Sequence, residues 1–246
     1  MTVPPLAESY RMAVIVLTRL PGSAWIGALA ILTLALELSM NVLHSACLAV
    51  LLCLAPVALA AAPKKEAKPE APKPVRVVLQ TDKGEIELEL DAARAPKTVR
   101  NFLAYVDAGL FEGGVFHRTV KLEPDNQPNN AVKIEVIQGS MNPAREAEVL
   151  PPIPLERTKD TGLQHKDGTV SMARDTPDSA RSDFFICIGD QPALDFGGKR
   201  NPDGQGFGAF GRVVKGMDVV RAIQQGPAEG QRLTPAIRIL RASRKG

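Results

Sequence analysis

Residues 114–120 read Gly-Val-Phe-His-Arg-Thr-Val, and the rest of the chain is best interpreted from this stretch. Its alternation predicts a β-strand in which Phe116, Arg118 and Val120 share one face, because successive side chains of a strand point to opposite sides. Arg118 would then lie on a largely apolar face. A guanidinium cannot lose its proton to escape desolvation, so it must find polar partners or face a cleft. Arg118 is therefore the first candidate functional residue.

A second stretch, residues 182–188, reads Ser-Asp-Phe-Phe-Ile-Cys-Ile and predicts a strand that presents an aromatic surface. It contains Cys187, which we interpret as a small buried hydrophobic residue because nothing nearby in sequence would activate its thiol. The other two cysteines, Cys47 and Cys53, lie in an apolar N-terminal run. A disulfide framework is therefore excluded for the folded domain.

Apolar periodicity predicts a mainly β domain over residues 75–243. Short alternating runs predict strands at residues 75–80, 85–90, 114–120, 134–138, 168–174, 183–189, 207–214 and 234–240. Helical stripes begin at Pro96 and Met217, and each is followed by a glycine. Because strands and helices do not alternate regularly, we predict a closed antiparallel barrel capped by two helices. The basic residues 241–246 are expected to form a solvated tail.

The N-terminal part reads as an export signal and a linker. Residues 40–60 contain an apolar run that ends in Ala58-Leu59-Ala60, and a small-x-small sequence after such a run is typical of a secretory signal peptide. We interpret residues 1–39 as a misassigned upstream extension. Residues 61–74 are rich in Pro, Lys and Ala, which predicts an extended, solvated linker. We expect a periplasmic or secreted protein, with an uncleaved membrane anchor as the alternative.

Composition limits the class of partner. The net charge of +3 gives no case for nucleic-acid binding. The three histidines do not occur with the spacing of a metal site, so metal catalysis is not predicted. His117 alternates away from Arg118, and His165 lies beside Lys166 in a predicted loop, so neither is given a role. We expect a monomer without metal or cofactor.

Five short motifs carry a family resemblance: Phe116-His117-Arg118, Gln138-Gly139, Ser171-Met172-Ala173, Phe184-Phe185-Ile186 and Phe210-Gly211-Arg212-Val213. In this order and approximate spacing they resemble the successive signatures of cyclophilin-type peptidyl-prolyl isomerases. The resemblance covers about residues 75–243. It implies a closed eight-stranded antiparallel barrel with a helix at each end, and an isomerase that needs no cofactor. Together with the predicted signal peptide, it indicates a bacterial, exported member that acts on proline-containing polypeptides.

The resemblance also implies roles for individual residues. Arg118 matches the catalytic arginine, which would stabilise the pyramidal prolyl nitrogen of the twisted bond. An arginine paired with a carboxylate across the barrel is the alternative for this position. The positions that match substrate-binding residues are the aromatic floor Phe185, the amide Gln138, the backbone at Ala173, the aliphatic Leu194, and Val136, Phe207 and Asp183, where the family has other side chains.

Several positions depart from the family pattern. Glu135 stands where a pocket Phe is usual, Val136 where Met is usual, Asp183 where Gln is common and Ala193 where many members have an aromatic residue. Residues 121–133 form a polar insertion, and residues 191–205 a long glycine-rich loop. These departures motivate the alternative function, a noncatalytic chaperone module that binds proline-containing peptides without isomerising them.

Overall fold

The computed structural model describes residues 74–245. The predictions for residues 1–39, for the signal peptide at 40–60 and for nearly all of the linker therefore lie outside the described residues. Within residues 74–245, no helix has both the length and the apolar composition that crossing a bilayer requires.

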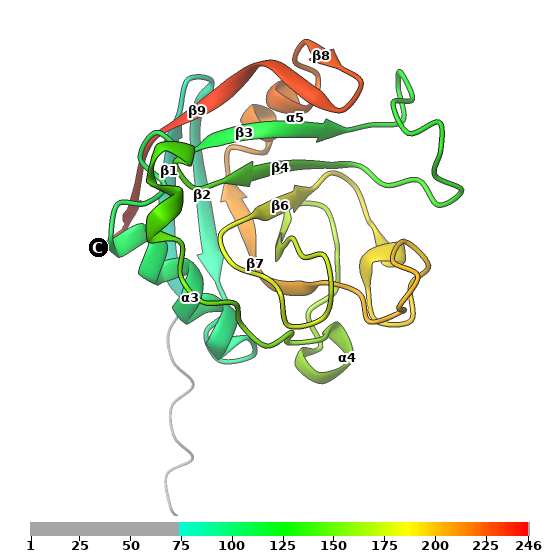
Figure 1. Cartoon of the computed structure of the whole chain (residues 1–246), viewed down its shortest axis with the longest axis horizontal. Coiled ribbons are helices and arrows are strands. Elements are labelled where there is room, and N and C mark those ends of the chain that lie inside the picture. The colour runs from blue at the N-terminus through cyan, green and yellow to red at the C-terminus, as the bar shows by residue number, and fades with distance from the viewer. Residues whose placement is uncertain (1–73, 246) are drawn as a thin grey trace, which may run out of the picture. The chain divides into compact units, whose positions relative to one another are not determined.

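Eight strands close into an antiparallel barrel in the order β1, β2, β7, β5, β6, β4, β3, β9, and the pairing of β9 with β1 completes the ring (Figure 1). The strands are β1 (Val75–Thr81), β2 (Gly84–Leu90), β3 (Val115–Val120), β4 (Val136–Ser140), β5 (Thr169–Met172), β6 (Phe184–Cys187), β7 (Gly208–Lys215) and β9 (Arg232–Arg244). The two-residue β8 (Ala228–Glu229) pairs only with β9. The predicted eight-stranded antiparallel barrel is confirmed.

Two helices pack on the barrel, α3 (Pro96–Asp107) and α5 (Met217–Gln224), and they lie on opposite sides of it in Figure 1. Pro96 stands in the first turn of α3, where its missing N–H costs no hydrogen bond. The structure adds a single helical turn, α4 (Thr158–Thr161), and 3₁₀ turns at Pro143–Glu148 and Pro192–Leu194.

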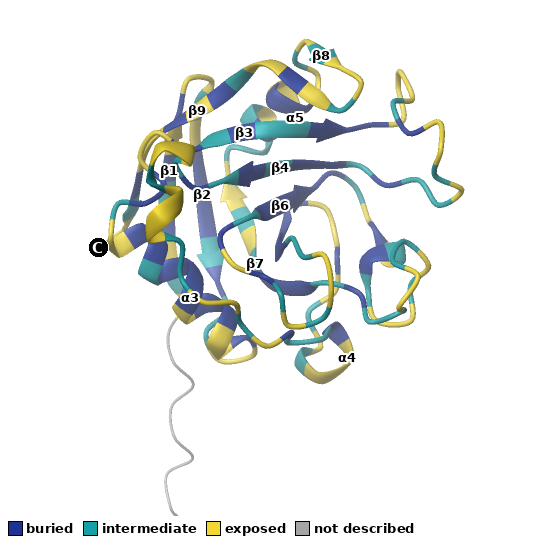
Figure 2. Ribbon diagram, in the orientation of Figure 1, coloured by how far each residue is buried: buried dark blue, intermediate teal, exposed yellow. Residues whose placement is uncertain are grey.

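The main core is a cluster of aliphatic and aromatic side chains inside the barrel, and the buried residues follow the strands in Figure 2. At its centre, the ring of Phe102 on α3 lies 5.0 Å from that of Phe111, 5.4 Å from that of Phe184 and 5.2 Å from that of Phe210. The helix is thus anchored through one aromatic residue that contacts three others. Aromatic side chains bury large areas, so this group contributes strongly to stability.

A second, smaller apolar group, here called the outer cluster, consists of Val120, Ile134, Val136, Phe185, Cys187 and Leu194. Along β6, Phe184 and Ile186 belong to the main core, whereas Phe185 and Cys187 belong to the outer cluster. The alternation of a strand therefore sends neighbouring residues into different cores. Burial raises the pKa of the Cys187 thiol, as expected for a small buried hydrophobic residue.

The register of β3 corrects the predicted strand face. Phe116 lies opposite Gly139, but Arg118 lies opposite Gln138, so the register shifts at His117. Because Gly139 and Gln138 are consecutive, the shift places Phe116 and Arg118 on opposite faces, although they are two residues apart. Phe116 joins the main core, and a Cβ on Gly139 would approach its ring to 3.0 Å. The prediction that Phe116 shares a face with Arg118 is wrong.

The prediction of a solvated basic tail is also wrong. Residues 241–244 continue β9 and pair with β1, because closing the ring requires a partner for that edge. Arg244 Nε lies 2.8 Å from Asp107 Oδ1, and Lys245 Nζ lies 2.8 Å from Glu87 Oε2. These basic residues pair with α3 and β2 beside the barrel seam, the junction of β1 and β9.

Candidate functional site

A groove of about 760 Å³ opens over the outer cluster. It is lined by all eight residues that the sequence singled out: Arg118, Val136, Gln138, Ala173, Asp183, Phe185, Leu194 and Phe207. They come from β3, β4 and β6, from the end of β5 and from the loop before β7. Residues that span about 90 positions of the chain thus meet on one surface because β3, β4, β6 and β5 are neighbours in the sheet.

Arg118 is held by two glutamines. Its Nη1 donates to Gln138 Oε1 at 2.9 Å, and its Nε and Nη2 donate to Gln231 Oε1 at 2.9 and 2.7 Å. Among the described residues no carboxylate pairs with it, so the alternative of an ion pair across the barrel is wrong. Burial lowers the pKa of Arg118, but a guanidinium remains protonated. Neutral acceptors therefore fix the side chain without cancelling its charge.

Gln138 continues the hydrogen-bond chain. While its Oε1 accepts from Arg118, its Nε2 donates to Asp183 Oδ2 at 3.2 Å. Asp183 Oδ1 accepts from the hydroxyl of Ser182 at 3.2 Å, and within residues 74–245 no cation pairs with this carboxylate. The amide is thereby oriented at both ends, and Arg118 is oriented with it.

The floor of the groove is Phe185. The ring of Phe207 lies perpendicular to it, at a centroid distance of 5.4 Å and an interplanar angle of 89°. Leu194 is buried beside it in the outer cluster. The groove therefore pairs an apolar aromatic floor with a fixed, uncompensated cation, which is suited to an apolar ring next to a group that accepts a hydrogen bond.

The comparisons with known proteins agree with this geometry. Residues 76–244 match the family described as "Cyclophilin type peptidyl-prolyl cis-trans isomerase/CLD". The chain belongs to the cyclophilin family. The match extends over most of the chain and includes every residue that lines the groove.

The relatives of this chain include bacterial peptidyl-prolyl isomerases. The chain is 38% identical over 157 residues to a peptidyl-prolyl cis-trans isomerase of Streptomyces antibioticus, which covers 60% of this chain and 82% of the relative. It is 38% identical over 151 residues to peptidyl-prolyl cis-trans isomerase A of Dickeya dadantii. This match covers 61% of this chain and 70% of the relative. A crystal structure of a Cryptosporidium parvum cyclophilin, in the presence of the dipeptide Ala-Pro, shares the fold with a TM-score of 0.56 at 21% identity, covering 70% of this chain and 99% of that chain.

His165, which sequence reasoning left without a role, lies directly behind the cyclophilin floor. Its ring stacks on Phe185 at 5.9 Å and 14°, its Nδ1 lies 2.7 Å from Asp195 Oδ1, and its Nε2 lies 2.9 Å from Ser171 Oγ. Ser171 is fully buried, so no substrate reaches its hydroxyl. This Ser-His-Asp arrangement therefore fixes the position of the ring that supports Phe185.

Glu135 does not face the groove. Its Oε1 accepts from Gln224 Nε2 on α5 at 3.2 Å, and Ile134 lines the groove instead. An apolar residue thus stands near the position where the family has Phe. The sequence contained the signal, because Ile134, Val136 and Gln138 alternate along one face.

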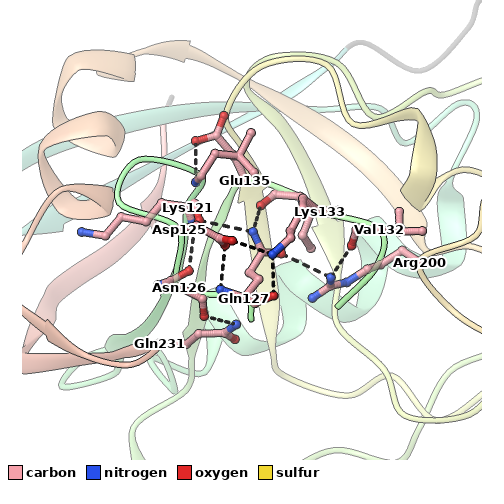
Figure 3. A network of polar contacts seen from close by, with 11 residues as sticks. Lys121, Asp125, Asn126, Gln127, Val132, Lys133, Glu135, Arg200 and Gln231 are labelled. Carbon is pink, nitrogen blue, oxygen red and sulfur yellow. Dashed lines mark hydrogen bonds and ion pairs between the residues drawn. The ribbon is translucent and has the colours of Figure 1, made fainter. Parts of the chain in front are cut away.

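Gln231, the second partner of Arg118, had no signal in the sequence. It lies between β8 and β9, 113 residues after the arginine, and its Nε2 donates to the backbone oxygen of Asn126 at 3.1 Å. The insertion at residues 121–133 therefore holds Gln231, as Figure 3 shows, and Gln231 holds Arg118. Within residues 74–245, no cluster of His, Cys, Asp and Glu side chains is arranged to hold a metal ion.

Proposed function

We propose that this cyclophilin accelerates rotation about Xaa-Pro bonds in exported proteins as they fold, in the periplasm or outside the cell. The observation that carries the proposal is Arg118, a cation held by neutral amides beside the aromatic floor Phe185. A Cryptosporidium parvum relative crystallised in the presence of Ala-Pro supports a proline-containing polypeptide as the ligand.

The mechanism follows from the chemistry of the amide bond. Rotation about a prolyl bond crosses a barrier of about 18–20 kcal/mol, because resonance holds the amide planar. In the twisted state the prolyl nitrogen is pyramidal and its lone pair accepts a hydrogen bond. A donor that is fixed beforehand and aimed at that nitrogen stabilises the twisted state more than the planar one.

The residues divide this work. Phe185, Phe207 and Leu194 hold the proline ring, while Arg118 donates to the prolyl nitrogen and Gln138 keeps the arginine oriented. A hydrogen bond that involves a charged group contributes about 1.5–3 kcal/mol net. Half-burial of Arg118 strengthens this bond because less water screens it, and among the described residues no carboxylate competes for the guanidinium.

A noncatalytic proline-binding module is the alternative. It predicts that the groove binds peptides but leaves their isomerisation rate unchanged. The test is a coupled isomerase assay on a short Xaa-Pro peptide with the full chain and its Arg118→Ala variant. We expect turnover with the parent chain and a large loss with the variant; binding without turnover in the parent chain would favour the alternative.

Export is supported by the apolar run of residues 46–62 and its small-x-small end. We expect cleavage after Ala60. N-terminal sequencing of the protein recovered from the periplasm or medium should give a mature start near Ala61. Recovery of the whole chain in the membrane fraction would instead favour an uncleaved anchor.

A further inference from the structure

Two loops that depart from the family pattern meet at Arg200, which belongs to the loop of residues 191–205. Its Nη1 donates to the backbone oxygen of Val132 at 2.6 Å and to Gln127 Oε1 at 3.2 Å, both in the 121–133 insertion (Figure 3). Gln127 is fully buried, and its amide also bonds the oxygen of Ile134 at 2.8 Å and the nitrogen of Ile134 at 3.1 Å. Arg200 is therefore anchored to a rigid support.

Arg200 lines the same groove as Arg118, and its charge is uncompensated. Among the described residues no carboxylate pairs with Arg200, and only its Nη1 donates a side-chain hydrogen bond. Arg174, on the same groove wall, differs: its Nη1 and Nη2 bond Asp203 at 2.8 and 3.0 Å. Burial, and then the charge of Arg118, lower the pKa of Arg200.

Arg118 and Arg200 line one groove, and among the described residues neither is paired with a carboxylate, so a substrate anion is attracted there. Gln138 and Gln231 accept from Nη1, Nε and Nη2 of Arg118. Arg200 donates side-chain hydrogen bonds only from Nη1, so its Nε and Nη2 are the donors left for such an anion.

We propose that Arg200 binds a carboxylate of the substrate, so that this cyclophilin prefers an acidic residue next to the proline. The proposal rests on the proposed function, in which Arg118 is reserved for the prolyl nitrogen. The α-carboxylate of a chain that ends in proline offers the same chemistry.

The first experiment compares peptides on the full chain. Ala-Ala-Pro-Glu-amide should have a kcat/KM about tenfold above that of Ala-Ala-Pro-Gln-amide at low salt, because one charge-assisted contact is added. The preference should shrink as salt rises, since the site is open to solvent. Ala-Pro and its amide, compared by calorimetric Kd, report separately on the α-carboxylate. The same comparison with Glu or Gln immediately before the proline tests the other neighbouring position.

The second experiment changes the protein. Arg200→Gln should abolish the Glu preference, so that the variant has equal kcat/KM for the Glu and Gln peptides. Lys199→Gln is the matched control, since Lys199 is the exposed neighbour and loses the same charge. Arg200→Glu should reverse the preference toward a Lys peptide. Arg200→Lys keeps the positive charge and should therefore keep part of the Glu preference. It tests the proposal even if Arg200→Gln loses the contact to Val132 and the loop unfolds.

The outcomes separate this proposal from the isomerase proposal. Equal kcat/KM and equal Kd for the Glu and Gln peptides in the parent chain would overturn the carboxylate site. So would a Glu preference that survives in Arg200→Gln. Tighter binding of the Glu peptide with no isomerisation of either peptide would reject the isomerase while leaving the carboxylate site supported.

Discussion

The main core and the outer cluster share strands, but the main core stabilises the barrel whereas the outer cluster supports the groove. The main core is packed from aliphatic and aromatic side chains, and its aromatic residues contact one another from several directions. The outer cluster underlies a groove whose wall includes Arg118, Gln138 and Asp183. The alternation of β6 separates the two, since Phe184 serves the barrel and Phe185 serves the groove. Stability and activity are therefore expected to respond to different substitutions on adjacent residues.

The largest effect is expected at Phe184, whose ring contacts Phe102, Phe111 and Phe116 at 5.4, 5.5 and 5.7 Å. Phe184→Ala should lower the free energy of unfolding by about 3–5 kcal/mol, because it leaves a cavity in a fully packed core. Urea unfolding measures the loss. The control is Phe185→Ala, which should destabilise less and weaken peptide binding more. If Phe184→Ala and Phe185→Ala lost equal stability, the main core and the outer cluster would not be energetically distinct.

The next effect is expected at Arg118. Arg118→Ala should lower kcat/KM by about one to three orders of magnitude, or about 1.4–4 kcal/mol of transition-state stabilisation. Its melting temperature should change little, because the side chain faces the groove. Arg118→Lys should recover little activity, since an ammonium lacks the planar fork that Gln138 and Gln231 hold. An Arg118→Ala variant that melts normally and turns over at the parental rate would remove Arg118 from catalysis.

Gln231 should show a smaller effect of the same kind. Gln231→Ala removes the acceptor of two hydrogen bonds, those from Nε and Nη2 of Arg118. It should lower kcat about three- to tenfold, with little change in KM. Gln231→Glu tests the reason, because a carboxylate would hold Arg118 but cancel its charge. It should therefore be no more active than Gln231→Ala. Full activity in Gln231→Glu would contradict the need for a neutral partner.

The smallest effect concerns the barrel seam. The hydrogen bond from Lys245, and then that from Arg76, lower the pKa of Glu87. A depressed carboxyl pKa adds stability above its usual pKa, and this stability is lost as the pH falls through the folded-state value. Lys245→Gln should therefore move the midpoint of acid unfolding to a higher pH while the groove keeps its activity. An unchanged midpoint of acid unfolding would show that the pair of Lys245 and Glu87 contributes no stability.

The features of the fold and of the site that could be predicted are those with a signal in a short stretch of sequence. The strand of residues 85–90 was readable because its Glu and apolar residues alternate, and the motif around Arg118 pointed to the groove. The shift at His117 was not readable, because a register depends on the partner strand. Nor were Gln231, Arg200 and His165, which lie in loops without periodicity. Their partners are distant in sequence, by 113, 73 and 30 residues.

The pairing of β1 with β9 has a consequence for how the domain can be joined to other chains. Val77 lies opposite Arg244, so the polypeptide enters and leaves the barrel at neighbouring strands. In the ring, β6 is four strands from β1 in either direction, which puts Phe185 on the far wall from that entrance. A short bridge between the two ends should permit circular permutation. Inserted as a module into a loop of another protein, the barrel would keep its groove turned away from its host.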